Sequence, residues 1–398
     1  MSTRKSAVNG SSVPAIASRA AAPASAPVRV MIVVGSLEVG GAQKHIYDLV
    51  RQFDRTRFDV SIVISQPGGY FYDRMRELGV PLYNLDVRSP RDLVLRLPRF
   101  LRFVRAVDPD VLHAFLYYPS LFGCLARLMP GRRAPRLILS KRSLNLSLRP
   151  DRLAVHKYIL MRVPDVFTAV SEPVRERCVA LGASPDKVKV IENGIEWIDA
   201  PPLGKLRQQL GLAEDVPLIG AVGSLTVRKR HRQLLRAMAE LLKVRPDAHL
   251  VLMGEGSLRG ELEEEVRRLG IEHRVHLPGM LVPAISYVRD LSIFVLPSSE
   301  EGLSNALLEA MMAGVPCVAS DIPSNREVIT DGEDGVIVDV EDPRAFAAAM
   351  TAVLGDPGRS RTLGAQARET IRRRYNARTM VDANEDLYMA LARQRRGA

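Results

Sequence analysis

Cysteine and tryptophan are scarce in this chain of 398 residues, which has three cysteines and one tryptophan. The cysteines, Cys124, Cys178 and Cys317, are odd in number and far apart along the chain. A disulfide framework needs an even set, and a zinc knuckle needs closely spaced pairs of cysteines. The sequence therefore indicates neither a disulfide-stapled fold nor a cysteine-based metal site, and a reducing cytoplasm suits it.

Long apolar runs are also missing. A membrane-spanning helix needs roughly 18 to 20 consecutive apolar residues, and no segment of the sequence approaches that length. Residues 1–27 are rich in Ala, Ser and Pro and lack the apolar core of a secretory signal. We expect them to form a disordered tail, and we expect the protein to be cytoplasmic.

Aromatic residues make up only 5% of the chain, whereas basic residues exceed acidic ones and give a formal charge of +11. Such a charge predicts an anionic partner, which could be nucleic acid, a membrane surface or a phosphorylated substrate. The chain lacks the interleaved aromatic and basic residues of single-strand binders, and it shows no helix-turn-helix or zinc-finger pattern. We therefore expect no nucleic acid among its partners.

Apolar strand-like runs alternate with amphipathic stretches, which is typical of parallel α/β sheets. We expect a Rossmann-like domain over residues 28–197, a linker over 198–216, a second Rossmann-like domain over 217–372 and a C-terminal helix over 373–398 that crosses back to the first domain. Because ligands bind beyond the carboxyl ends of such strands, the two domains should face a cleft. The expected strands are 28–34, 58–65, 111–113, 136–140, 166–170, 188–191, 218–222, 249–253, 274–277, 291–296, 315–319 and 335–338.

The segment 297–316 is the most informative part of the chain. A polar loop follows an apolar strand and leads into a helix, and the loop and helix carry two carboxylates, Glu301 and Glu309. Gly302 lets the backbone come close to a ligand, and the helix N-terminus attracts a negative group with roughly half a charge. Carboxylates suit the hydroxyl groups on either side of a diphosphate, so the segment predicts a nucleotide-sugar site.

A surface loop capped by Ser304 or Asn305 is the alternative interpretation, since both are good N-cap residues. That alternative explains these two residues. It does not explain the paired carboxylates, the small-residue loop and the Gly-Val-Pro exit at Gly314 to Pro316 together.

Two other turns have the composition of phosphate sites. Gly40 and Gly41 lie between a strand and a helix, where amides without side chains can approach phosphate. An ordinary tight turn is the alternative there. Lys229, flanked by Arg228 and Arg230, lies at a second such turn, where a solvated helix start is the alternative.

In this order, the segments resemble the retaining glycosyltransferases of family 4, which have the two-domain GT-B fold. Glu301 and Glu309 match the family's pair of glutamates, and the resemblance covers nearly the whole chain from about Val28. The other matching segments are G-G-A-Q (Gly40 to Gln43), S-E-P-V-R (Ser171 to Arg175), E-N-G-I (Glu192 to Ile195), V-G-S-L-T-V-R-K-R-H (Val222 to His231) and G-E-G-S-L (Gly254 to Leu258).

The resemblance implies transfer from a nucleoside-diphosphate sugar with retention, without a metal or another cofactor. It implies that Glu309 holds the ribose hydroxyls and that Glu301 holds those of the transferred sugar. Lys229 would neutralise the diphosphate, which elsewhere a metal does, and Arg228 is a further candidate contact. The other donor-binding residues that it implies are Gly40, Gly41, Gly254, Gly302, Leu303, Ser304 and Asn305.

Two positions depart from the family's pattern. Ser224 stands where members usually carry an arginine, and Arg228 or Arg230 could substitute for it. His113 ends a strand beside the predicted cleft and is the candidate for the family's acceptor-side catalytic histidine, although a lone histidine is also often structural. The family often has His-x-His here, whereas this chain has Phe115 at the third position.

The acidic triplet Asp108-Pro109-Asp110 imitates the metal-binding Asp-x-Asp of the other glycosyltransferase fold. It precedes a strand in a proline-containing turn, and nothing nearby in the sequence completes a metal shell. We interpret it as a turn and expect no metal site.

Segment 88–107 places five arginines among leucine, valine and phenylalanine. It could be a helix docked on the sheet with a solvated basic face, or it could attach the protein peripherally to anionic lipid on the inner face of the membrane. We expect Pro98 to limit any continuous amphipathic helix.

Together these features predict a hexosyltransferase-type enzyme that moves a sugar from a nucleoside-diphosphate donor to an acceptor hydroxyl, on a lipid-linked or polysaccharide precursor of the cell envelope. Acceptor contacts should come from loops of the first domain, such as residues 141–145. An epimerase or hydrolase of the same fold is one alternative, and a non-catalytic partner in glycan assembly is another.

Overall fold

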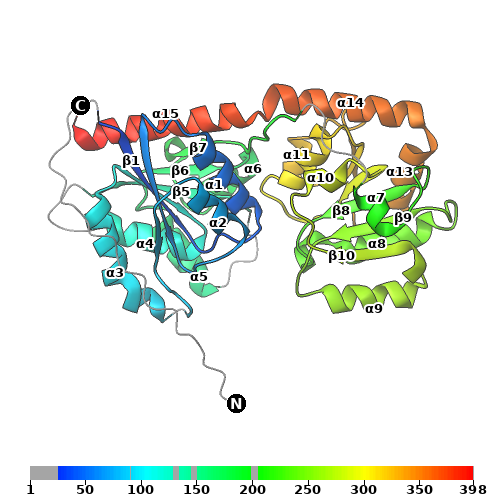
Figure 1. Ribbon diagram of the computed structural model, residues 1–398, viewed down its shortest axis with the longest axis horizontal. Helices are drawn as coiled ribbons and strands as arrows, with labels where there is room; N and C mark the ends of the chain where they lie inside the picture. Colours follow the sequence, from blue (N-terminus) through cyan, green and yellow to red (C-terminus); the bar gives the residue numbers. More distant parts are fainter. Residues whose placement is uncertain (1–25, 90, 129–133, 145–149, 199–204, 398) are drawn as a thin grey trace, which may run out of the picture.

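The computed structural model describes residues 26–89, 91–128, 134–144, 150–198 and 205–397. Two α/β domains lie side by side and are joined by a long helical segment along one side (Figure 1). Each domain is built on one parallel sheet, as the sequence predicts. The tail expected over residues 1–27 lies almost entirely outside the described residues.

The first sheet has seven strands in the order β3-β2-β1-β4-β5-β6-β7. Its central strands are buried on both faces, as parallel strands covered by helices must be. Along β1, Val30 and Ile32 face one layer of helices, and Met31 and Val33 face the other. The strands are β1 (Val28–Val34), β2 (Phe58–Ile64), β3 (Leu82–Asn84), β4 (Val111–Phe115), β5 (Arg136–Lys141), β6 (Val166–Ala169) and β7 (Val188–Val190).

Helices cover both faces of this sheet. The first-domain helices are α1 (Gly41–Gln52), α2 (Tyr70–Glu77), α3 (Asp92–Val107), α4 (Tyr117–Arg127), α5 (Pro150–Val155) and α6 (Glu172–Ala180). A five-residue π-helical turn, His156–Leu160, follows α5. Contrary to our expectation, Pro98 lies within a continuous α3, because proline there only removes one exposed backbone hydrogen bond and a docked helix can retain the rest.

The second sheet has six strands in the order β10-β9-β8-β11-β12-β13. Its strands are β8 (Leu218–Val222), β9 (His249–Met253), β10 (Val275–Gly279), β11 (Ile293–Leu296), β12 (Cys317–Ser320) and β13 (Val336–Val338). Its helices are α7 (Lys205–Leu210), α8 (His231–Leu241), α9 (Arg259–Leu269), α10 (Ile285–Val288), α11 (Asn305–Met312), α12 (Pro323–Arg326) and α13 (Pro343–Gly355). Residues 199–204 of the predicted linker lie outside the described residues, and its second half contains α7.

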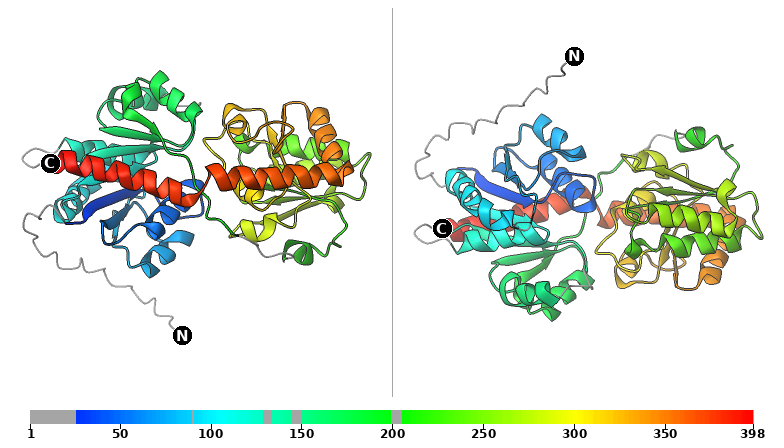
Figure 2. Two further views of the ribbon diagram at one scale, coloured as in Figure 1. Left: turned by 90° about the horizontal axis from the view of Figure 1, so that it is seen from above. Right: turned by 90° about the horizontal axis from the view of Figure 1, so that it is seen from below.

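Two consecutive helices end the chain and connect the domains. Helix α14 (Pro357–Arg374) packs on α11 of the second domain, and α15 (Ala377–Arg396) crosses back to the first sheet, as predicted. Figure 2 shows both helices from above, with a break between them. At the break, Asn376 caps α15 by accepting a hydrogen bond from Arg378 N.

The far end of α15 is held by ion pairs. Asp110 accepts hydrogen bonds from Arg395 Nη1 at 3.1 Å and Arg396 Nη2 at 2.6 Å, and Asp108 pairs with Arg29 at 2.8 Å. The Asp-Pro-Asp triplet is therefore a turn that anchors the last helix. Across the described ranges, no group of three His, Cys, Asp or Glu side chains could hold a metal ion.

Candidate functional site

A cavity of about 750 Å³ lies between the two domains, a size usual for small-molecule sites. The loops that follow β1, β4 and β5 line it from the first domain, and those that follow β8, β9 and β11 line it from the second. This is the edge where the carboxyl ends of parallel strands meet. Every predicted donor-binding residue lines the cavity: Gly40, Gly41, Arg228, Lys229, Gly254, Gly302, Leu303, Ser304, Asn305 and Glu309.

Glu309 lies on α11 with its side chain almost fully buried at the cavity wall. Lys44 reaches it from α1 of the other domain, with Lys44 Nζ 3.9 Å from Glu309 Oε1 and 2.7 Å from Asp48 Oδ2. Burial raises the pKa of Glu309, and the charge of Lys44 opposes that rise. Burial alone would lower the pKa of Lys44, but Asp48 and Glu309 outweigh it, so that pKa is raised. The lysine is thus a cation shared by two carboxylates from different domains.

Glu301 and Lys229 form a second pair in the cavity. Lys229 Nζ lies 2.5 Å from Glu301 Oε1, and Ser298 Oγ donates to the same oxygen at 2.7 Å. Both side chains are largely buried, so water screens the pair little. The carboxylate expected at the sugar and the cation expected at the diphosphate are therefore direct neighbours.

Gly302 lies in close contact with the opposite domain. A Cβ atom there would lie 2.3 Å from the backbone oxygen of Arg142 in the first domain. We expected this glycine to let the backbone approach a ligand, but its nearest neighbour is the opposite domain. A side chain at this position would clash with the backbone of Arg142, so the contact requires glycine.

Asn305 adds polar contacts across the same boundary. It accepts a hydrogen bond from Asn193 Nδ2 at 2.6 Å, and its own Nδ2 donates to the backbone oxygen of Gly41 at 3.3 Å. Ser304 caps α11 by accepting from Leu307 N at 3.4 Å. The capping alternative is thus correct for Ser304, and the residue still lines the cavity.

The glycine turns of the second domain pack directly on one another. A Cβ atom on Gly254 would lie 1.9 Å from the backbone oxygen of Gly223. Ser224 follows in the same loop and also lines the cavity. The backbone oxygen of Arg228 accepts a hydrogen bond from Ser299 N at 2.9 Å, which ties this loop to the one that carries Glu301. The cationic residues Arg228 and Lys229 line the cavity at this loop, where they can attract an anionic group.

Comparison with known proteins identifies the family of this chain. The model of the family described as "Glycosyl transferases group 1" matches residues 204–370, and that of "Glycosyltransferase Family 4" matches residues 39–196. The D-inositol 3-phosphate glycosyltransferase of Xylanimonas cellulosilytica is 32% identical over 383 residues, which cover 85% of this chain and 89% of that relative. The chain belongs to the group 1 glycosyltransferases.

Two further relatives support this assignment. The lipopolysaccharide core biosynthesis glycosyltransferase LpsD of Rhizobium meliloti is 28% identical over 358 residues, covering 88% of this chain and 95% of LpsD. The crystal structure of Anabaena HepE in complex with UDP-glucose aligns with a TM-score of 0.81 at 20% identity, over 91% of this chain and 99% of that chain. The structural likeness confirms the predicted GT-B fold.

One predicted residue of this glycosyltransferase is not at the cavity. His113 is fully buried in β4, where its Nδ1 lies 2.7 Å from the hydroxyl of Tyr388 on α15 and its Nε2 lies 3.4 Å from Thr168 Oγ1. Burial, with the nearby charge of Arg142, lowers its pKa to about 3, so the ring is neutral. The structure places His113 among the contacts that dock α15, and it gives no support to the catalytic role expected for it.

Several polar cavity residues had no individual role assigned from the sequence, among them Lys44, Asp48, Asn193 and Arg142, the last of which lies in the loop 141–145 expected to contact the acceptor. Lys44 directly follows the G-G-A-Q turn, and Asn193 lies within the matched E-N-G-I segment. Both could therefore have been predicted as cavity residues from these motifs. Arg142 had no signal beyond its place in a loop. Burial lowers its pKa to about 9, and its guanidinium donates a hydrogen bond to Asn193.

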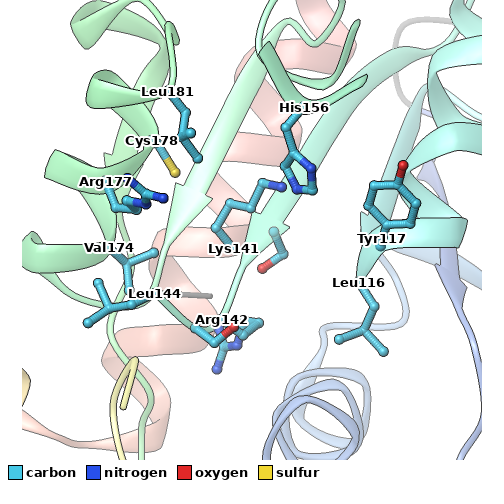
Figure 3. Close-up of a pocket in the computed structure, with 12 residues that line it drawn as sticks. Leu116, Tyr117, Lys141, Arg142, Leu144, His156, Val174, Arg177, Cys178 and Leu181 are labelled. Atoms are coloured by element: carbon cyan, nitrogen blue, oxygen red, sulfur yellow. The ribbon is translucent and has the colours of Figure 1, made fainter. Parts of the chain in front are cut away.

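A smaller cavity of about 120 Å³ lies beside the main one in the first domain (Figure 3). Leu116, Arg142 and Ser143 line both cavities. The other lining residues come from α4, β5 and the loop after it, the turn at His156, and α6 and the residue after it. Part of the loop expected to contact the acceptor, residues 141–144, therefore lies at the junction of the two cavities, and Asn145 lies outside the described residues.

Proposed function

We propose that this glycosyltransferase transfers a sugar from a nucleoside-diphosphate donor, with retention of configuration and without a metal, to a hydroxyl group of a glycan or lipid-linked acceptor. The observation that carries the proposal is the grouping of Glu309, Glu301 and Lys229 in one interdomain cavity. Glu309 would accept hydrogen bonds from the ribose, and Glu301 from the sugar.

Lys229 supports the metal-free part of the proposal. Its ammonium supplies a positive charge beside Gly223, and this charge would stabilise the negative charge that develops on the departing diphosphate. The departing phosphate oxygen would then take the proton of the acceptor hydroxyl as the new glycosidic bond forms on the same face. The contact of Gly302 with Arg142 helps to exclude water, which would otherwise hydrolyse the donor.

The printed names of relatives support the classes of donor and acceptor. HepE is described in complex with UDP-glucose. A relative from Escherichia coli, 23% identical over 84% of this chain, is named as a galactosyltransferase that acts on GlcNAc-diphosphoundecaprenol. LpsD is named for lipopolysaccharide core biosynthesis. These names favour a sugar linked to a nucleoside diphosphate and an acceptor from glycan assembly.

A thermal-shift screen of nucleoside diphosphates and their sugars tests the proposal directly, because a ligand that binds the folded state raises its melting temperature. We expect one base and its nucleotide sugar to stabilise the protein at micromolar to millimolar concentration. No stabilisation by any of the common nucleotide sugars would support the non-catalytic alternative. Rapid conversion of the donor without acceptor would support a hydrolase or epimerase instead, and the anomeric configuration of the product reports on retention.

We also propose that the protein works at the cytoplasmic face of a membrane, to which α3 attaches it. Among the described residues, no helix is long and apolar enough to cross a bilayer. The outer face of α3 instead exposes Val94 (76% accessible) and Leu95 (72%), next to the exposed Arg91 and Arg102. Exposed apolar side chains flanked by arginines suit the interface of an anionic bilayer.

Flotation with vesicles that contain anionic lipid, at low and at high salt, tests this attachment. We expect the protein to float with the vesicles, and we expect Val94→Glu with Leu95→Glu to abolish flotation. The matched control is Val244→Glu, at another exposed valine, on the second domain (61% accessible). Absence of wild-type flotation at both salt concentrations would refute the attachment and leave the transferase proposal intact.

A further inference from the structure

Among the residues that the structure describes, three cationic side chains line the smaller cavity, those of Lys141, Arg142 and Arg177, and no carboxylate does. Figure 3 shows Lys141 and Arg177 extending toward the same space from β5 and α6. Such a concentration of one charge inside a protein is unfavourable unless a partner of opposite charge occupies the space.

Lys141 has the least favourable surroundings of the three. It ends β5, and none of the residues that the structure describes accepts a hydrogen bond from its ammonium. Among the described residues, the groups that favour its charged form are the thiols of Cys178 and Cys124, and burial raises the pKa of Cys178 to about 11, so that thiol is neutral. Burial correspondingly lowers the pKa of Lys141. No described neighbour compensates its charge.

The two arginines also lack carboxylate partners within the described ranges. The Nε atom of Arg177 is buried without a hydrogen bond. Arg142 donates to the side-chain oxygen of Asn193, which is a neutral group. Opposite them, His156 stacks on Tyr117 with ring centroids 5.2 Å apart and forms a wall of the cavity.

The position of the cavity relates it to the transfer reaction. Leu116, Arg142 and Ser143 line both cavities, and the backbone of Arg142 touches Gly302 beside Glu301. Leu116 holds a left-handed backbone angle, φ 72°, with its side chain 45% accessible. Strained backbone at such a junction is typical of ligand sites. A ligand in the small cavity could therefore extend toward the sugar end of the main one.

We propose that the acceptor is anionic and that Lys141 and Arg177 bind its oxyanion, a phosphate or a carboxylate, in the small cavity. This inference rests on the proposed function, because it assigns the cavity to the acceptor of that same transfer. The fork of Arg177 matches two oxygens of such a group, and Lys141 contributes a point charge. The oxyanion fixes the acceptor so that a hydroxyl group reaches the donor sugar.

The test is a calorimetric titration with inorganic phosphate, with and without a saturating nucleoside diphosphate that occupies the donor site. We expect wild-type protein to bind phosphate in both conditions. Lys141→Met and Arg177→Met should each weaken the binding that persists beside the nucleoside diphosphate by at least tenfold. The matched control is Lys189→Met, which removes an exposed lysine of β7 in the same domain and should leave phosphate binding unchanged.

A competition arm distinguishes the sources of the oxyanion. Glucose 6-phosphate represents soluble sugar phosphates, and a short prenyl diphosphate represents lipid-linked acceptors. Displacement of phosphate by either supports the proposal and identifies the source. Phosphate binding that both variants retain at wild-type strength overturns the proposal, as does failure of both competitors to displace it. If no nucleoside diphosphate binds, the donor proposal fails. The titration without nucleoside diphosphate still shows whether phosphate binding depends on Lys141.

Discussion

Lys229 and Glu301 form an ion pair inside the cavity, with Lys229 Nζ 2.5 Å from Glu301 Oε1. Because each holds the other in place, neither acts alone on the donor. The carboxylate of Glu301 orients the ammonium group that would bind the diphosphate. In turn, Lys229 and Ser298 hold the carboxylate in the position from which it would bind the sugar.

Lys229→Ala should reduce turnover at saturating donor by about 100-fold or more, the effect of removing one preorganised donor from a developing negative charge. Initial rates measured with the donor identified in the screen check this. Lys243→Ala, which removes an exposed lysine paired with Glu240 on the same domain, is the control. Turnover of the Lys229 variant at the wild-type rate would contradict its role.

Glu309→Gln should weaken donor binding by about 10-fold to 100-fold, since a hydrogen bond to a charged group contributes about 1.5 to 3 kcal/mol. Isothermal titration calorimetry with the nucleoside diphosphate measures the change. Glu300→Gln, at a buried glutamate that does not line the cavity, serves as the control. Unchanged affinity in the Glu309 variant would remove this residue from the ribose site.

Lys44→Met should make donor binding more sensitive to acid. The charge of Lys44 lowers the pKa of Glu309 against the effect of burial, so its removal lets that pKa rise further. Glu309 then takes up its proton at a higher pH, and affinity should begin to fall at a higher pH than in the wild type. Titrations across pH 5 to 8 test this, and superimposable profiles would show that Lys44 does not control the ionisation of Glu309.

His113→Phe should lower stability but spare catalysis, because the imidazole contacts Tyr388 and Thr168 rather than the cavity. Loss of the partner of a buried hydroxyl costs about 1 to 3 kcal/mol, which urea unfolding can measure. The pKa of His113 is about 3 in the folded protein against an ordinary 6.5. As the pH falls below about 6.5 the unfolded chain binds the proton first, so the wild type should lose stability there and the variant should lack this contribution.

A fall of more than about 100-fold in kcat for folded His113→Phe would contradict this account and restore a catalytic role. The matched variant is Tyr388→Phe, which removes only the hydroxyl group that meets the ring. It should reproduce part of the stability loss with no change in kcat.

Asp110→Asn should destabilise the protein by about 3 kcal/mol, because it leaves the arginines at the end of α15 without their buried carboxylate. Urea unfolding followed by circular dichroism checks the value. Asp382→Asn, which breaks an exposed pair with Arg378 on the same helix, should change stability by less than about 1 kcal/mol. Equal effects of the two substitutions would show that the anchor contributes no more than a surface pair.

Much of the fold was predictable because parallel strands leave a strong apolar signal. The expected strand 28–34 and the observed β1 coincide, and so do 218–222 and β8. Strand β3 was missed, since it has three half-buried residues and lies at the edge of the sheet, where no apolar run is required. The continuity of α3 through Pro98 was also mispredicted, because tertiary packing outweighs the local cost of proline.

Residues that line the cavity were predicted from the sequence only where they belong to a recognisable motif. Glu301, Glu309 and Lys229 lie together because each follows a recognisable turn at the carboxyl edge of the second sheet. Arg142 and Asp48 carry no such local pattern, and only the docking of the two domains shows that they face the same space. The position of His113 in the sequence matches that of the family's histidine. In the structure, however, its side chain extends from β4 toward α15 and not toward the cavity.

The crossing of α15 has a consequence for how this protein is made. One face of the first sheet is completed by Met380, Val381, Tyr388 and Leu391, which lie near the end of the chain. Domains usually fold in the order in which the ribosome releases them. Here the domain that is synthesised first cannot close its core until the second domain has been translated and α15 has left the ribosome.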